Sequence, residues 1–134
     1  MSLFGSFFKK SADTKENKNE SNVNWIPLTS VAQLKEIDTV SKQKPVIVFK
    51  HSTRCAISKN VIKNFDRSFP TQLKDKINVY YLDLLNHRDT SNEIGYKYQV
   101  LHQSPQLLLI HKGKAVLHAS HYDIAQIDLE KIVK

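Results

Sequence analysis

The 134-residue chain is 40% hydrophobic and 25% charged, a composition that is ordinary for one soluble globular domain. Its single cysteine excludes an intramolecular disulfide, and hence a bridge-stabilised exported scaffold, so we expect a reducing, cytoplasmic setting. The net charge of +7 comes from basic residues scattered over the whole length, which argues against nucleic acid as a partner and favours anionic small molecules or acidic protein surfaces.

The N-terminal region looks unlike a membrane-directed segment. Residues 1–10 are apolar first and basic afterwards, the reverse of a secretory signal, and no run approaches the ~20 apolar residues that span a bilayer. Phe4, Phe7 and Phe8 allow weak peripheral docking to a membrane or a partner. Residues 9–24 are polar and have little to bury, so we expect a flexible leader and linker over 1–24 and a folded domain over 25–134.

The first half of the domain alternates strand and helix patterns. Residues 25–28 are extended, and Ser30 with Gln33 fits a capping box for a helix whose apolar stripe is Val31, Leu34, Ile37 and Val40. The apolar residues 45–49 predict a buried strand that ends at Phe49 or Lys50. A helix follows Cys55 and runs to about Phe65, with the stripe Ile57, Val61, Ile62 and Phe65.

The second half ends in a hairpin. Residues 77–83 are a mostly apolar strand, as in a parallel sheet covered on both faces, and residues 86–98 are a helix. Strands over 106–111 and 115–120 flank a tight turn, and Asp123 caps a last helix carrying Ile124, Ile127, Leu129 and Ile132. The order β-α-β-α-β-α-β-β-α predicts a thioredoxin-like α/β fold, a central mixed sheet flanked by helices.

The lone cysteine sits where a buried strand meets a helix, a common place for chemistry. If Cys55 starts the helix, the free N–H groups of the first turn, together with Arg54 and Lys50, stabilise a thiolate, which is the reactive form. Ser58 completes a C-x-x-S pattern and could donate a hydrogen bond to that thiolate, but it cannot attack a disulfide. The pattern therefore indicates a one-cysteine thiol–disulfide exchanger, whereas a buried, inert cysteine is the plainer alternative.

Three other positions bear on this site. In a thioredoxin-like fold the loop before the third central strand abuts the active cysteine and carries a cis proline, which predicts a cis Pro105 beside Cys55. His51 and His102 flank the site and either one can tune the thiolate. Phe49 stands where dithiol thioredoxins typically carry a buried carboxylate, in agreement with the missing second cysteine.

Other cysteine chemistries lack a required residue. A peroxiredoxin needs a proline where Val48 stands, and a cysteine phosphatase or arsenate reductase needs an arginine where Val61 stands. Cluster-binding monothiol glutaredoxins use C-G-F-S, but Ala56 removes the glycine. One cysteine and dispersed histidines give no metal-ligand set, so we expect neither a metal nor a bound cofactor.

Two segments together, residues 49–58 (F-K-H-S-T-R-C-A-I-S) and 100–106 (V-L-H-Q-S-P-Q), resemble the YtxJ-type bacillithiol-system redox proteins of low-GC Gram-positive bacteria. The resemblance covers about residues 25–134 and implies a thioredoxin-like, monothiol bacilliredoxin. Such a protein takes bacillithiol from protein mixed disulfides onto its own cysteine, so its partners are bacillithiol, as a co-substrate, and bacillithiolated proteins. One departure is Ala56, where a proline often follows the family cysteine.

The resemblance also implies roles for individual residues. Cys55 is the nucleophile, and Ser104 and Pro105 form the opposite wall. Arg54 and Ser58 are expected to support Cys55 because of their positions next to it in the loop and in the helix start. The residues expected to contact the substrate are Lys50, His51, Thr53, His102 and Ser104. Two alternatives stay open: a non-catalytic thioredoxin-like adaptor in which Cys55 is incidental, and a redox sensor whose Cys55 is capped under stress.

Overall fold

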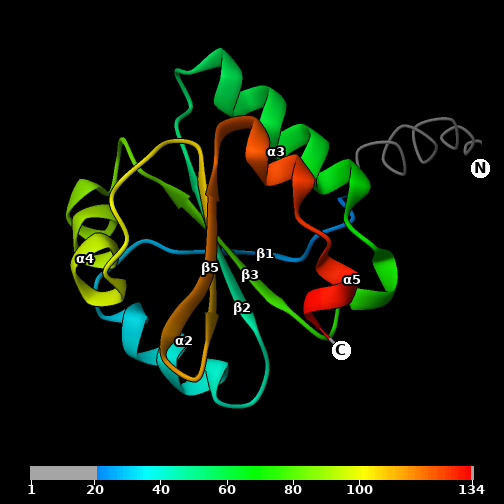
Figure 1. Ribbon diagram of the computed structural model, residues 1–134. Coiled ribbons are helices and arrows are strands. Elements are labelled where there is room, and N and C mark those ends of the chain that lie inside the picture. Colours follow the sequence, from blue (N-terminus) through cyan, green and yellow to red (C-terminus); the bar gives the residue numbers. More distant parts are fainter. Residues whose placement is uncertain (1–20, 134) are drawn as a thin grey trace, which may run out of the picture.

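A five-stranded mixed sheet forms the centre of the protein, and helices cover both of its faces (Figure 1). The computed structural model describes residues 21–133. Its strands, in the spatial order β1-β3-β2-β4-β5, are β1 Trp25–Pro27, β3 Asn78–Asp83, β2 Val46–His51, β4 Gln106–His111 and β5 Lys114–Ser120. The first three strands run parallel, and β4 is antiparallel to both β2 and β5. The predicted thioredoxin-like arrangement is therefore confirmed.

The helices divide the core into two layers. One layer lies between the sheet and α2 (Gln33–Ser41) with α4 (Arg88–Tyr98), and the other lies under α3 (Ala56–Ser68), the 3-10 helix η2 (His121–Gln126) and α5 (Leu129–Ile132). A short 3-10 turn, η1 (Thr71–Leu73), follows α3. Both layers are apolar, as expected when each face of a parallel sheet is covered by helices.

Strand β2 runs through the middle of the sheet, and all six of its residues are buried. Because side chains alternate along a strand, Ile47 and Phe49 pack under α3, while Val46 and Val48 pack under α2 and α4. The same alternation continues to the polar end of the strand. Lys50 therefore falls on the α2/α4 face.

Helix boundaries differ in detail from the pattern-based predictions. Helix α3 continues to Ser68 rather than ending near Phe65, and α4 begins at Arg88, two residues later than predicted. The predicted cap at Asp123 was wrong, because residues 121–126 form the 3-10 helix η2. Asp128 instead caps α5, where its Oδ1 accepts a hydrogen bond from the Lys131 backbone N–H at 3.3 Å.

Two residues assigned to buried helical stripes are exposed. Val31 is 40% exposed because α2 begins only at Gln33, and Ile57 is 41% exposed in the first turn of α3, beyond the end of β2. Only one of the two hydrogen bonds of the predicted capping box forms. Gln33 Oε1 accepts from the Ser30 backbone N–H at 3.1 Å, but the Ser30 hydroxyl does not cap α2. Helix ends are the positions that periodicity determines least well.

The hairpin between β4 and β5 turns at Lys112–Gly113, and both residues have positive φ angles, 52° and 76°. Such angles suit a two-residue hairpin turn, and glycine at the second position carries no Cβ penalty. The Gly113 N–H donates to Ser41 Oγ at 2.9 Å, which ties the turn to the end of α2.

The chain packs against α3 from the first described residues. Val23 is buried, and Asp66 on α3 accepts hydrogen bonds from the Ser21 hydroxyl, the Asn22 backbone N–H and the Trp25 indole. The predicted domain boundary between residues 24 and 25 thus falls inside a packed segment. The predictions for the phenylalanine-rich leader concern residues 1–20 and lie outside the described residues. No helix in the described part of the chain is long and apolar enough to cross a membrane.

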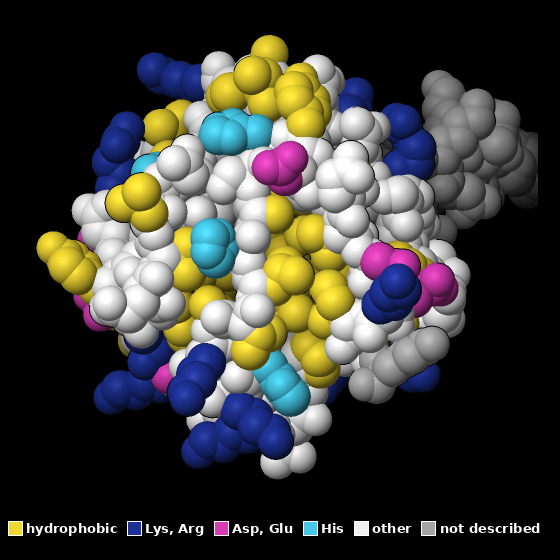
Figure 2. All heavy atoms as spheres, in the orientation of Figure 1, with side chains coloured by type: hydrophobic (Ala, Val, Ile, Leu, Met, Phe, Trp, Pro, Cys, Tyr) yellow, Lys and Arg dark blue, Asp and Glu magenta, His cyan; other side chains and the backbone are white. Residues whose placement is uncertain are grey.

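Figure 2 shows one face of the molecule. Hydrophobic side chains gather near its centre, beside β5, and Lys and Arg side chains lie mainly around the periphery. On this strand Val116 is exposed, and Leu117 and Ala119 are half-buried. The positive charge is thus dispersed over this face, as the sequence predicts.

Candidate active site

Cys55 stands at the start of α3, as predicted. It is the N-cap residue, with φ −105° and ψ 122°, and its carbonyl oxygen accepts the first helical hydrogen bond from the Lys59 N–H at 3.0 Å. Its own N–H donates to Ser52 O at 3.2 Å, which closes the loop that leads from β2. The half-buried thiol does not cap the helix. The unpaired N–H groups of the first turn therefore keep their partial positive charge beside the sulfur.

The loop of residues 99–105 reaches the same edge of the sheet. The Ser104–Pro105 peptide bond is cis, as predicted. Lys50 pairs with Gln106 across β2 and β4, so Pro105, the residue before Gln106, lies beside the end of β2, from which the loop to Cys55 begins. Two segments that are about fifty residues apart in the chain thus meet at one edge. This edge is the candidate site.

His51 joins the end of β2 to the first turn of α3. Its Nδ1 is hydrogen-bonded to Ser58 Oγ at 2.7 Å, and the Ser52 N–H donates to the same oxygen at 3.1 Å. Both His51 and Ser58 are buried. Burial lowers the pKa of His51, an effect that Asp83 opposes and Lys59 reinforces. The predicted hydrogen bond from Ser58 to the thiolate is replaced by these contacts, so Ser58 orients the helix start.

Lys50 makes the corresponding connection on the other face of the sheet. Its side chain is fully buried, and its Nζ donates to Ser91 O on α4 at 3.2 Å and to His102 Nδ1 at 3.3 Å. Burial lowers the pKa of Lys50 to about 8. We predicted Lys50 as a cation beside the cysteine, but strand alternation directs it towards α4, away from α3.

Two neighbouring residues of β2 therefore hold the two walls of the site. His51 holds the α3 wall through Ser58, and Lys50 holds the wall formed by α4 and the 99–105 loop through His102. Four of the predicted site residues therefore form two separate hydrogen-bonded pairs, His51 with Ser58 and Lys50 with His102. Because both pairs are buried at least in part, their hydrogen bonds act in a low-dielectric setting.

The remaining predicted residues lie on the loops. Thr53 and Arg54 are exposed in the turn before Cys55. Ser104 is half-buried, and its Oγ, like Gln106 Oε1, has no hydrogen-bond partner within residues 21–133. A buried acceptor without a donor is costly and uncommon in native proteins. Both atoms belong to the residues on either side of Pro105, so this wall contains two buried oxygen atoms that make no hydrogen bond within the described residues.

Some residues of this site were not predicted. Ser91 acts through its backbone carbonyl, a group that every residue has, so no sequence signal marks it. Gln106 Nε2 donates to Leu101 O at 2.9 Å and braces the loop. Its only signal was a polar residue at the start of an apolar strand, and Lys50 carried the same signal at the end of β2.

Phe49 sits in an aromatic cluster beneath α3. It is fully buried, with ring centroids 5.3 Å from Phe65 and 5.9 Å from Trp25. The place where dithiol thioredoxins carry a proton-transferring carboxylate is thus apolar in this protein. Within residues 21–133, no three His, Cys, Asp or Glu side chains lie close enough to share a metal ion.

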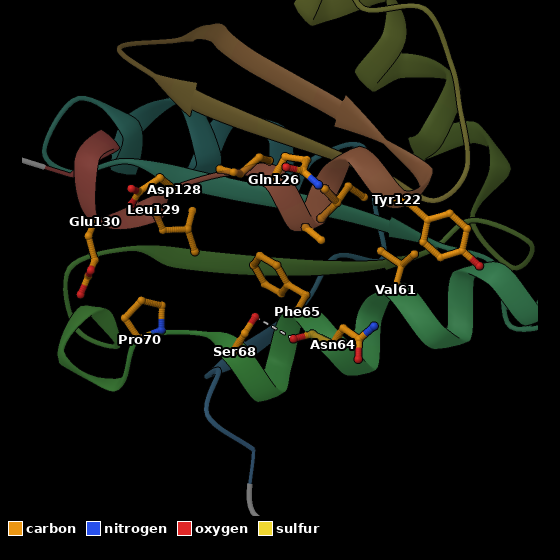
Figure 3. Close-up of a pocket in the computed structure, with 13 residues that line it drawn as sticks. Val61, Asn64, Phe65, Ser68, Pro70, Tyr122, Gln126, Asp128, Leu129 and Glu130 are labelled. Atoms are coloured by element: carbon orange, nitrogen blue, oxygen red, sulfur yellow. Dashed lines mark hydrogen bonds between the residues drawn. The ribbon is translucent and has the colours of Figure 1, made fainter.

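An apolar groove of about 350 Å³ lies along a different part of α3 (Figure 3). Val61 and Phe65 line one side, and Ile124 and Leu129 line the other, with Tyr122 at one end. The groove begins more than one turn beyond Cys55 and extends towards the C-terminal end of the helix. It is therefore separate from the edge that carries Cys55 and Pro105.

Comparisons with known proteins agree with this geometry. The family model of the monothiol bacilliredoxin BrxC matches residues 26–129. A solved structure described as a candidate oxidoreductase with a thioredoxin fold is 34% identical, with a TM-score of 0.62 over 75% of this chain and 85% of that chain.

More distant structures share the fold alone. Malassezia sympodialis thioredoxin is 18% identical, with a TM-score of 0.65 over 84% of this chain and 89% of its own. Trypanosoma brucei brucei thioredoxin is 19% identical, with a TM-score of 0.62 over 81% and 90%. The family match spans most of the chain, including Cys55 and Pro105. The chain therefore belongs to the monothiol bacilliredoxin BrxC family.

Proposed function

We propose that this protein removes bacillithiol from protein mixed disulfides by thiol–disulfide exchange at Cys55. The observation that carries the proposal is the placement of the only cysteine. Cys55 is the N-cap of a 13-residue helix, at the sheet edge where the chain also places the cis Pro105. The coarser role, a thiol oxidoreductase, agrees with the family and with the fold of the 34% identical structure.

The reaction has two steps. In the first, the Cys55 thiolate attacks the bacillithiol sulfur of a modified protein, the mixed disulfide breaks, and the protein leaves as a thiolate. In the second, a free bacillithiol thiolate attacks capped Cys55, which releases Cys55 and forms bacillithiol disulfide. The client sulfur is reduced to a thiol, one free bacillithiol is oxidised as it joins the bacillithiol taken from the client in a disulfide, and no second protein cysteine is needed. A stabilised thiolate is also the better leaving group in the second step.

The walls of the site support this chemistry. The first turn of α3 provides N–H groups and partial positive charge beside the sulfur, and the exposed Arg54 adds a full charge. His51 is kept neutral by burial, so it holds Ser58 and the helix start without adding charge next to the thiolate. Phe49 leaves the site without a buried carboxylate, which fits a reaction that uses a single sulfur.

The test is intact-protein mass spectrometry of the purified protein mixed with a bacillithiolated test protein, with a glutathionylated test protein as the comparison. We expect one bacillithiol on Cys55 and loss of the cap from the test protein. Equal transfer from both modified proteins would retain the exchange chemistry but contradict bacillithiol as the preferred thiol. If Cys55 stays free while the test protein stays capped, the adaptor hypothesis replaces exchange.

The matched variant is Cys55→Ser. We expect it to abolish exchange while its circular dichroism and thermal unfolding stay close to wild type, because the thiol makes no helix-capping hydrogen bond and serine fits an N-cap position. Exchange that survived in this variant would refute the assignment of Cys55 as the nucleophile.

A further inference from the structure

A cluster of cationic and hydrogen-bonding groups lies beside the 99–105 loop, on the α2/α4 side of the sheet. It consists of Lys50 from β2, Arg88 and Ser91 from α4, and His102 from the loop. We infer that this cluster is a carboxylate-binding subsite for the small anionic thiol that exchanges at Cys55, with His102 as the hydrogen-bond donor and Lys50 as its positioning residue. The inference rests on the proposed function and deepens it.

The chemistry of Lys50 determines the direction of the hydrogen bonds. An ammonium group has three donors and no acceptor, so Nζ must donate both to Ser91 O and to His102 Nδ1. Nδ1 is then the acceptor, and the single ring proton of neutral His102 is on Nε2. Because His102 is an exposed residue, this Nε2–H remains available to a ligand. The other ring contact, from Ser91 Oγ to Nδ1 at 3.5 Å, also involves only Nδ1.

The charges around His102 favour an anion. Burial lowers the pKa of His102, and the positive charges of Lys50 and Arg88 lower it further, so the imidazole is neutral at pH 7. Arg88 and Ser91 are three residues apart on α4 and therefore lie on neighbouring positions of one helix face. A carboxylate at this place would accept from one fixed N–H donor and lie in the field of two positive charges, the exposed Arg88 and the buried Lys50.

The surroundings offer room for a small ligand. Ser91 and His102 line an open hollow of about 600 Å³ between α4 and the loop that follows it. Gln106, the first residue of β4, is the cross-strand neighbour of Lys50, and its Nε2 donates to Leu101 O, so it braces the loop that carries His102.

The first experiment reads the imidazole directly and does not depend on catalysis. In Cys55→Ser protein labelled with ¹⁵N histidine, we expect His102 to show the Nε2–H tautomer, and bacillithiol to shift its ring signals. Lys50→Met should give a mixture of tautomers. Lys50→Met and Arg88→Gln should each weaken bacillithiol binding roughly three- to tenfold, the range for contacts to a charged group that is partly solvated.

The control is Arg67→Gln, which removes the same charge at the far end of α3 and should leave bacillithiol affinity unchanged. A His102 tautomer that is the same with and without Lys50 would overturn the positioning role. Binding that is equal in wild-type and Arg88→Gln proteins would overturn the subsite. Arg88 is exposed at the start of α4, so this second variant tests the inference even if Lys50→Met does not fold.

The second experiment separates this inference from the proposed function. Steady-state reduction is measured with bacillithiol disulfide and with uncharged hydroxyethyl disulfide, with uncharged dithiothreitol in both cases as the thiol that reduces capped Cys55. We expect Arg88→Gln to raise KM for the anionic disulfide without changing kcat, and to leave the uncharged disulfide unaffected. Equal losses for both disulfides would mean a structural defect and would contradict the subsite. If the wild type exchanges with neither, the proposed function fails, while the binding measurement still decides the subsite.

Discussion

Ser58 holds the helix start against the end of β2, and its buried hydroxyl serves two partners, His51 Nδ1 and the Ser52 N–H. Ser58→Ala leaves both partners without their hydrogen bond, which costs about 1–3 kcal/mol of stability. We also expect slower exchange at Cys55, because the first turn of α3 loses its anchor. Denaturant unfolding and the mass-spectrometric exchange rate measure the two effects.

The control for that variant is Ser68→Ala in the last turn of α3. The Ser68 hydroxyl donates only to Asn64 O and is exposed, so its loss should change stability by less than about 0.5 kcal/mol and leave exchange unchanged. If the two variants behave alike, the anchoring role of Ser58 is wrong.

Helix α3 does more than carry Cys55, because its Asp66 also holds the segment that precedes β1. Three donors converge on this carboxylate: the Ser21 hydroxyl, the Asn22 N–H and the Trp25 indole N–H at 2.9 Å. Asp66→Ala should cost about 2–3 kcal/mol, since hydrogen bonds to a charged group are the stronger kind. It should also shift Trp25 fluorescence, because the indole loses its acceptor.

Asp75→Ala provides the comparison for Asp66→Ala. Asp75 is exposed, and only its backbone carbonyl is used, by Lys44 Nζ at 3.2 Å. Denaturant unfolding followed by tryptophan fluorescence should separate the two variants. An Asp66→Ala protein with wild-type stability would show that α3 and the N-terminal segment are held by apolar contacts alone.

The stability of the whole molecule should depend on Lys50 through pH. Its pKa is about 8 in the folded protein and 10.5 when solvated, so the unfolded chain binds more protons between these values. Wild-type stability therefore gains a rising contribution from about pH 8 to 10.5, and the full cost of burying the charge is present below pH 8. That cost is about 3 kcal/mol, since one pKa unit corresponds to about 1.4 kcal/mol.

Lys50→Met removes the buried charge and keeps most of the side-chain volume. We expect it to raise the free energy of unfolding at pH 7 by about 1–3 kcal/mol, less than the full cost because the hydrogen bond to Ser91 O is lost. The difference between wild type and variant should shrink above pH 8. Urea unfolding at several pH values measures it, and a variant that is less stable at pH 7 would contradict the prediction. If the Lys50→Met variant is more stable than the wild type but binds bacillithiol more weakly, Lys50 is retained for function and not for stability.

Local pattern was enough for most of the architecture. Alternation and apolar runs predicted the ends of β2, β3 and the strands of the β4–β5 hairpin to within two residues. They could do so because side chains alternate between the two faces of a strand, so the pattern is visible within a few neighbouring residues. The polar loop between β2 and α3 was also visible in the local sequence, and it indicated that Cys55 lies outside the core strand. Helix ends were less well predicted, as Asp123 and Val31 show, since capping depends on the path of the chain beyond the helix.

The sequence by itself determined the order of elements, the fold class and the single sulfur on which the proposed chemistry depends. Only the tertiary structure decided what the polar residues around that sulfur contact. His102 is 52 residues from Lys50, and Ser91 is 41 residues away, so packing of α4 and the 99–105 loop against β2 creates these contacts. The periodicities of strands and helices are local, whereas a hydrogen-bond partner across the chain exists only after the core has closed around it.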